Sequence, residues 1–261
     1  MLYAVFGNPI EHSRSPTIHQ LFARQEKVDL IYEKRLVTHT LAQALHDFEN
    51  DGGLGANVTV PCKTEAFELS SQLSERARMA GAVNTLFRLP ENQGWYGDNT
   101  DGIGLVRDIQ RLGVSLHDAR ILLLGAGGAA RGIIYPLKEA GAHISIANRT
   151  FAKAQELSDW FNIQAIEFSD ITPSFDMIIN STSASLSQQT LPIDNQVFAN
   201  AVLAYDLVYG NTAFIQQAKQ AKTALCVDGL GMLVAQAAAS YALWRGFEPD
   251  IEPVLETLKK S

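Results

Sequence analysis

Residues 121–131 read Ile-Leu-Leu-Leu-Gly-Ala-Gly-Gly-Ala-Ala-Arg, an apolar run that ends in a cluster of glycines. The run predicts a buried strand that passes through a tight turn into a helix. Gly125 and Gly127 permit the turn and let backbone N–H groups approach a pyrophosphate, and Ala130 takes the third small position of G-x-G-x-x-G/A. The N-terminus of the helix adds a partial positive charge. The stretch therefore predicts a dinucleotide-binding turn.

The end of the next predicted strand, residues 143–147, indicates which dinucleotide is bound. An NAD site usually places Asp or Glu there to bind the ribose 2′-hydroxyl, but this chain continues with Asn148-Arg149-Thr150. Each charge-assisted bond from Arg149 to a 2′-phosphate would be worth roughly 1.5–3 kcal/mol. A glycine turn alone also arises for structural reasons, so the flanking strands and Arg149 carry the prediction of NADP.

The composition limits the class of protein. Of the 261 residues, 46% are hydrophobic and 19% charged, which is typical of a soluble globular protein. The net charge of −7 argues against a broad nucleic-acid surface. No apolar run approaches the ~20 residues that span a membrane, and the N-terminus does not resemble a signal peptide. Two cysteines, Cys62 and Cys226, make neither a disulfide framework nor a metal quartet, which favours the cytoplasm.

Short apolar strands alternate with helical patterns along the chain, which predicts a parallel α/β architecture. Strands are expected near residues 2–6, 31–36, 55–60, 84–88, 121–125, 143–147, 164–167, 176–180, 202–207 and 224–228. Helices are expected near residues 16–26, 41–49 and 63–80, from about 101, and near 231–245 and 252–260.

We expect two α/β domains separated by a cleft. A substrate domain with a mainly parallel sheet would comprise residues 1–100 plus 230–261, and a Rossmann-like NADP-binding domain would comprise residues 101–229. Ligands of such folds gather at the carboxyl ends of the strands, so the reactive centre is expected in the cleft.

Two polar runs in the first hundred residues have both a structural and a functional interpretation. Ser15 before Pro16 suits the N-cap of a helix, but its hydroxyl and that of Ser13 would also hold a small anion at the helix N-terminus. In the second run Asn57 and Thr59 share one face of a strand. Lys63 then falls in the first turn of a helix, where a cation opposes the macrodipole, so a purely solvated lysine is less favoured.

Two later positions are similarly ambiguous. Asp101 follows a run of amide and acidic side chains, and it suits either the cap of the next helix or a catalytic role. Gln236 interrupts an otherwise apolar helix, so its amide is either satisfied internally or directed at a ligand.

Together and in this order, these segments resemble the shikimate dehydrogenase family over nearly the whole chain. The matching segments are Ser13-x-Ser15-Pro16, Asn57-Val58-Thr59-x-Pro61-x-Lys63, Ala82-Val83-Asn84-Thr85, Asp98-Asn99-Thr100-Asp101-Gly102, Gly125-Ala126-Gly127-Gly128-Ala129, Asn148-Arg149-Thr150 and Asp228-Gly229-x-Gly231-Met232-Leu233-Val234-x-Gln236.

The resemblance implies an enzyme that reduces the ring ketone of 3-dehydroshikimate with NADPH, in the pathway to the aromatic amino acids. It implies that Lys63 and Asp101 form a catalytic pair, with Lys63 as the acid/base group or as an orienting group beside a water relay. The substrate-binding residues would be Ser13, Ser15, Asn57, Thr59, Asn84, Tyr209 and Gln236.

The same resemblance implies a set of cofactor-binding residues and no metal. The set is Gly125, Ala126, Gly127, Gly128, Ala129, Asn148, Arg149, Thr150, Lys153, Thr182, Gly229 and Met232. Family members often have a second basic residue three positions after the Thr, and Lys153 occupies that position here. The chain departs from the family pattern at Ser181 and in the short turn after Tyr209.

Two alternatives remain open at this point. One is a paralogue that also acts on quinate, with NAD; Arg149 argues against it. The other is a non-catalytic NADP-sensing module, which would have no need of Lys63 and Asp101. The expected partner is a small molecule, without nucleic acid or membrane, and the protein would be a monomer or a homodimer.

Overall fold

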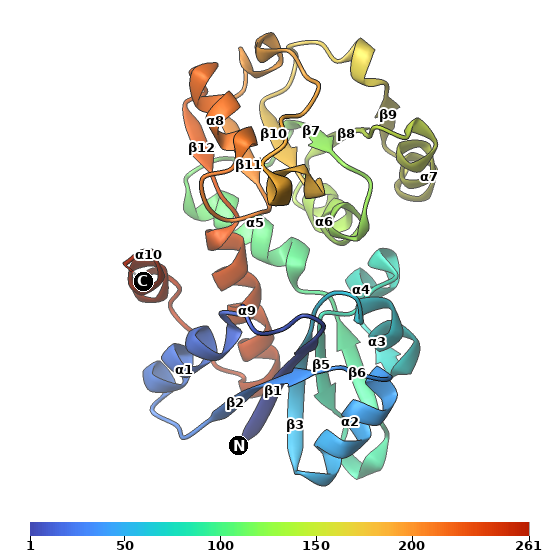
Figure 1. Ribbon diagram of the computed structural model, residues 1–261, viewed down its shortest axis with the longest axis vertical. Coiled ribbons are helices and arrows are strands. Elements are labelled where there is room, and N and C mark those ends of the chain that lie inside the picture. Colours follow the sequence, from blue (N-terminus) through green and yellow to red (C-terminus); the bar gives the residue numbers. More distant parts are fainter. Residues whose placement is uncertain (261) are drawn as a thin grey trace. The chain divides into compact units, whose positions relative to one another are not determined.

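The computed structural model describes residues 1–260. The chain forms two compact units, Met1–Gly104 with Val234–Ser261 and Leu105–Leu233 (Figure 1). Both boundaries lie inside helices, α5 (Asp101–Arg111) and α9 (Leu230–Arg245), a few residues later than the domain limits expected from the sequence. Each of these two helices therefore contributes residues to both units.

The first unit is built on a mixed sheet in the order β2-β1-β3-β5-β6-β4. β1 pairs in parallel with β2 and β3, β4 pairs in parallel with β6, and β5 is antiparallel to both β3 and β6. The strands are β1 (Leu2–Gly7), β2 (Ile31–Leu36), β3 (Gly53–Val58), β4 (Ser70–Leu73), β5 (Thr85–Arg88) and β6 (Trp95–Asp98).

Helices cover both faces of this sheet (Figure 1). On one face, side chains of the sheet such as Phe6 and Leu86 pack with Phe48 into an apolar cluster under α2 (Leu41–Asn50), α3 (Lys63–Leu69) and α4 (Glu75–Ala80). On the other face lie α1 (Ser15–Glu26) and α9, where aromatic rings dominate: Trp244 stacks on Tyr3 at 4.8 Å between centroids. The last helix is α10 (Glu252–Lys259).

The single helix expected over residues 63–80 is wrong. The chain forms α3, then the edge strand β4, then α4, and β4 pairs with β6, a strand that the sequence analysis did not identify. Ser70 ends α3 in an extended conformation, and Ser74 begins α4 by accepting a hydrogen bond from Ala77 N. Pairing with β6 outweighs the helix propensity of this stretch, because propensity is a weak preference that tertiary contacts override.

The second unit contains an entirely parallel sheet in the order β12-β11-β10-β7-β8-β9. The chain starts in the middle, at β7, winds outward through β8 and β9, and returns to continue from β10, which is the doubly wound order of dinucleotide-binding folds. The strands are β7 (Arg120–Leu124), β8 (His143–Ala147), β9 (Gln164–Ile166), β10 (Met177–Asn180), β11 (Leu203–Asp206) and β12 (Leu225–Val227).

The connections of this sheet are only partly α-helical. Regular helices are α6 (Gly128–Glu139), α7 (Phe151–Phe161) and α8 (Ala213–Gln220), whereas the two crossovers around β10 contain the short turns η2 (Phe168–Asp170), η3 (Ser183–Ser187) and η4 (Asn195–Phe198). Apolar side chains of these crossovers, Phe198 among them, pack with Leu122 and Ile178 of the sheet into one core cluster.

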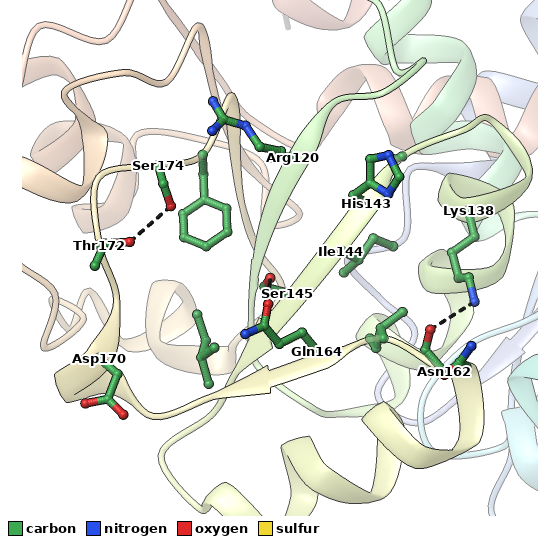
Figure 2. A pocket seen from close by; sticks show the side chains of 14 residues that line it. Arg120, Lys138, His143, Ile144, Ser145, Asn162, Gln164, Asp170, Thr172 and Ser174 are labelled. Atoms are coloured by element: carbon green, nitrogen blue, oxygen red, sulfur yellow. Dashed lines mark hydrogen bonds between the residues drawn. The ribbon is translucent and has the colours of Figure 1, made fainter.

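A pocket of 790 Å³ opens over β8 and β9, beside the crossover that contains η2 (Figure 2). Arg120 and His143, the first residues of β7 and β8, line it, and Ser145 bonds Gln164 across the neighbouring strands. The predicted glycine turn instead follows the last residue of β7. The pocket is therefore at the other end of the strands from the predicted nucleotide site and contains none of its residues.

Asp206, at the end of β11, is a fully buried carboxylate that ties the loops of the second unit together. It accepts hydrogen bonds from Ser185 Oγ at 2.5 Å, Thr212 Oγ1 at 2.6 Å and Asn180 Nδ2 at 3.3 Å. Thr212 Oγ1 also accepts from Ile215 N and so caps α8. A buried charge without donors is very costly. These bonds therefore fix the loop after β10, which contains Ser185, and the loop before α8, which contains Thr212.

We expect Thr212→Val to lower the free energy of unfolding by about 1–3 kcal/mol, because it removes a donor to a buried carboxylate and a helix cap. Urea unfolding would measure the change. Thr257→Val is the matched control, since the Thr257 hydroxyl bonds Pro253 O at the surface, and it should change stability by less than about 0.5 kcal/mol. Equal losses in both variants would contradict this assignment.

Candidate active site

Lys63 and Asp101, which the sequence places 38 residues apart, form an ion pair in the first unit. Lys63 is the first residue of α3 and Asp101 the first of α5, and Lys63 Nζ lies 2.5 Å from Asp101 Oδ2. The side chains are 28% and 16% exposed, so the pair is shielded but accessible. The carboxylate offsets the unfavourable position of an ammonium at a helix N-terminus.

Asn84 holds the other oxygen of this carboxylate. Its Nδ2 donates to Asp101 Oδ1 at 2.8 Å, while its Oδ1 accepts from Thr100 N at 2.9 Å and from Thr85 Oγ1 at 2.8 Å. Gln236 Oε1 lies 3.4 Å from Asn84 Nδ2. Hydrogen bonds thus join four residues predicted from the sequence into one cluster: Lys63, Asn84, Asp101 and Gln236.

Asn57 is buried behind this cluster, and the protein itself engages both ends of its amide. Its Oδ1 accepts from Tyr32 OH at 2.7 Å and bonds His19 Nε2 at 3.1 Å. Its Nδ2 donates toward Asn84 O at 3.2 Å, and Thr85 Oγ1 and Ser240 Oγ are further acceptors at 3.2 and 3.0 Å. Its contact with a substrate remains a prediction.

Ser15 is not the N-cap of α1 that the sequence suggested. Ser15 is the first helical residue, and the N-cap is Arg14, without a side-chain cap. Ser13 Oγ instead accepts from Ser15 N at 3.3 Å. Ser15 is buried and its side chain hydrogen-bonds Tyr32, so it reaches the same polar region as Asn57.

Thr59 follows the end of β3 and lies against β1. Its N–H donates to Phe6 O at 2.8 Å, and a Cβ at Gly7 would meet the Thr59 methyl group at 2.5 Å. Gly7 therefore allows the close approach that places Thr59 at the carboxyl ends of both strands.

Five further buried residues complete this region, and the sequence alone assigned no role to any of them: His19, Tyr32, Thr85, Thr100 and Ser240. His19 is fully buried on α1, and its ring stacks on Tyr32 at 4.3 Å between centroids. Burial lowers the pKa of His19 to about 3, only partly opposed by the bond to Asn57, so the ring is neutral. The sequence signal for a buried His19 was its position on the apolar face of the helix, one residue after Ile18 and three before Phe22.

The second unit contains the predicted cofactor residues. Gly125 has φ of +101°, and a Cβ there would crowd Ser181 Oγ at 2.8 Å. Gly127 is the N-cap of α6 and Gly128 its first residue, and nothing lies within 4 Å of a Cβ built at either. Together with Ala126 and Ala129, they leave the N-terminus of α6 open, which fits a pyrophosphate.

The end of β8 carries exposed cations that fit a ribose phosphate. Asn148 Nδ2 donates to Thr150 O at 2.9 Å and shapes the turn into α7. Arg149, Thr150 and Lys153 are exposed. The NADP site predicted from the sequence therefore has both an open helix N-terminus and two cations at the adjacent strand end.

The remaining predicted cofactor residues lie in the same unit. Thr182 Oγ1 donates to Asn180 Oδ1 at 2.8 Å, and Met232 N donates to the hydroxyl of Tyr205 at 3.1 Å. Any Cβ at Gly229 would clash with Leu207 O, so only glycine fits there.

Ser181, one of the departures from the family pattern, has a structural role. Its Oγ donates to Leu124 O at 2.8 Å and so ties the end of β10 to the glycine turn. Tyr209 is 44% exposed, and its short turn is held by Gly210 N, which donates to Asp228 Oδ2 at 2.6 Å.

No helix within residues 1–260 is long and apolar enough to cross a membrane. The same residues contain no group of three or more His, Cys, Asp or Glu side chains arranged to hold a metal ion.

The burial of His19 makes stability depend on pH. In the unfolded chain this ring has its ordinary pKa of 6.5, whereas burial in the folded protein lowers the pKa to about 3. Between these values the unfolded state binds more protons, so the free energy of unfolding falls as the pH falls, by up to about 1.4 kcal/mol per pH unit.

His19→Gln removes this titration. We therefore expect the stability advantage of the wild type over the variant to shrink when the pH is lowered from 7 to 5, as measured by urea unfolding at each pH. An advantage that stays constant over this range would show that His19 is not a buried neutral histidine.

Three family models match the chain. They are described as the shikimate dehydrogenase substrate binding domain over residues 5–86, shikimate / quinate 5-dehydrogenase over residues 107–196, and the shikimate 5'-dehydrogenase C-terminal domain over residues 229–259.

Individual relatives agree over the full length. The chain is 48% identical to a shikimate dehydrogenase (NADP(+)) of Vibrio cholerae, over 99% of this chain and 96% of that protein. Among solved structures, an Ael1 enzyme from Pseudomonas putida is 40% identical with a TM-score of 0.94, covering 98% of this chain and 97% of the other. Shikimate 5-dehydrogenase from Thermus thermophilus, solved with NADP(H) and shikimate, is 30% identical with a TM-score of 0.90, covering 100% and 99%. The chain belongs to the shikimate dehydrogenase family.

Proposed function

We propose that this protein catalyses the reversible NADPH-dependent reduction of 3-dehydroshikimate to shikimate, a step in the biosynthesis of the aromatic amino acids. The observation that carries the proposal is the Lys63–Asp101 pair, with 2.5 Å between Nζ and Oδ2. The pair lies beside the polar side chains of Asn84 and Gln236. A purely nucleotide-sensing protein has no need of a shielded ammonium held in this way.

The chemistry requires a proton donor at the ring ketone. Bound NADPH supplies a hydride, and the carbonyl oxygen then carries negative charge that must be neutralised. The Lys63 ammonium donates a proton to this oxygen, and Asp101 holds the ammonium in place. In the oxidative direction the neutral amine accepts the proton from the substrate hydroxyl.

The other polar residues of the first unit would bind the substrate. Ser13 and Ser15, at the N-terminus of α1, suit a carboxylate because hydroxyl donors and the helix dipole both favour an anion there. Thr59, Asn84 and Gln236 would contact the ring hydroxyls, with Asn57 close behind them.

The second unit would bind NADP. The pyrophosphate would lie on residues 125–129 at the start of α6, and the 2′-phosphate would bind Asn148, Arg149, Thr150 and Lys153. Thr182, Gly229 and Met232 would complete the site. Arginine offers a planar fork for the phosphate, whereas Lys153 adds a point charge.

We also propose a cytoplasmic enzyme that is a monomer or a homodimer. Both cysteines, Cys62 and Cys226, are free thiols, which supports a reducing compartment.

Lys63→Ala tests the catalytic assignment. We expect kcat to fall about 10²–10⁴-fold because the proton donor is lost, while the NADPH dissociation constant, measured by fluorescence titration, changes less than twofold. Lys259→Ala, an exposed lysine in the last turn of α10, is the control and should retain wild-type turnover. Turnover of Lys63→Ala within a few-fold of the wild type would contradict the role of Lys63.

Arg149→Ala tests the cofactor assignment. We expect the preference for NADP over NAD, as the ratio of kcat/KM values, to fall about 10- to 100-fold through loss of the charge-assisted bonds to the 2′-phosphate. The kcat/KM with NAD in the same variant is the internal control and should stay nearly constant. A parallel loss with both cofactors would mean that Arg149 acts on folding or on a shared part of the nucleotide.

A further inference from the structure

The amide of Asn57 is the point where the aromatic cluster around α1 meets the polar cluster around Asp101. One end of the amide faces His19 and Tyr32, and the other faces Asn84, Thr85 and Ser240. Asn57 is 7% exposed, so the protein alone decides which way its amide points.

The main-chain oxygen of Asn84 fixes one end of this amide. It is an obligate acceptor 3.2 Å from Asn57 Nδ2, so a flipped amide would bring two oxygens together. Asn57 Oδ1 must then face His19 and Tyr32, and both must donate to it. His19 therefore carries its proton on Nε2, and His19 Nδ1 is a buried atom with no hydrogen-bond partner in the protein, where a proton would be costly.

The amide in turn supports the residues that orient Asp101. Thr85 Oγ1, an acceptor for Asn57 Nδ2, lies 2.8 Å from Asn84 Oδ1. Asn84 presents its own Nδ2 to Asp101 Oδ1 at 2.8 Å. Ser240 adds a second hydroxyl, 2.8 Å from Thr85 Oγ1. If the Asn57 amide turned over, the main-chain oxygen of Asn84 and the hydroxyl groups of Thr85 and Ser240 would all lose Asn57 Nδ2 as a donor.

We propose that His19 and Tyr32 are positioning residues for the reaction: together they lock the Asn57 amide, and through Asn84 they hold Asp101 and hence the Lys63 ammonium. The proposal rests on the proposed function, since the readout is turnover of 3-dehydroshikimate. Neither residue needs to touch the substrate. Their two donors act on one oxygen, so each can partly replace the other.

The test compares variants that keep or remove one donor. His19→Phe keeps a ring to stack on Tyr32 but loses the N–H, and we expect kcat about five- to tenfold lower with an unchanged KM for NADPH. His19→Gln places an amide N–H near the position of Nε2 and should restore kcat to within about twofold. Tyr32→Phe should resemble His19→Phe.

The double variant His19→Phe/Tyr32→Phe gives the sharpest result. Because the last donor to Asn57 Oδ1 is then gone, kcat should fall by more than the product of the two single effects. If the double variant does not fold, the difference between His19→Phe and His19→Gln decides the question.

Phe22→Leu separates positioning from simple packing. Phe22 is fully buried and its ring lies edge-on to His19 at 5.9 Å between centroids. The variant should lower the unfolding temperature but leave kcat at 25 °C within twofold. The proposal is overturned if His19→Phe retains wild-type kcat, if Gln does not rescue it, or if Phe22→Leu lowers kcat equally. A wild-type protein without turnover would overturn the proposed function, and this inference with it.

Discussion

The two oxygens of Asp101 are held by two different side chains, and the geometry of the candidate active site depends on this. A carboxylate bonded only by Lys63 would rotate about its own bonds and carry the ammonium with it. With Asn84 on the second oxygen, the plane of the carboxylate is fixed and so is the position of Lys63 Nζ. Asn84 is fixed in turn by the main chain of Thr100 and by the hydroxyl of Thr85. Preorganisation of this kind lets a charged group act without a reorganisation cost when the proton moves.

A carboxylate also organises a hydrogen-bond network in the second unit. Asp108, on α5, is fully buried and accepts from Tyr205 OH at 2.6 Å and from Arg111 Nε at 2.8 Å. The Tyr205 hydroxyl also receives Met232 N, at the start of α9. Burial and the neighbouring Asp108 raise the pKa of Tyr205 well above its ordinary value, so the phenol remains a donor. These bonds place Met232, a predicted cofactor residue, without requiring a ligand.

Periodicity was enough to predict the parallel sheet around residues 121–131, because its signal is local. The NADP site at its glycine turn rests on Arg149 as well and stays a prediction. The strand Trp95–Asp98 escaped prediction because it is short and contains a glycine, and its partner Ser70–Leu73 lies in a sequence that favours helix. His19 and Tyr32 were missed for a different reason. His19 is a single polar side chain on the apolar face of α1, and Tyr32 precedes three charged residues in β2. Only the three-dimensional structure shows that both face Asn57.

We propose that the first unit places a proton donor for one particular ring substrate and that the second unit selects NADP. The most direct measurement is the initial rate of substrate oxidation by the wild-type protein with shikimate and with quinate, each with NADP⁺ and with NAD⁺. We expect kcat/KM to be highest for shikimate with NADP⁺, by at least tenfold over each other combination. Equal or higher kcat/KM for quinate with NAD⁺, or no oxidation of shikimate at all, would contradict it.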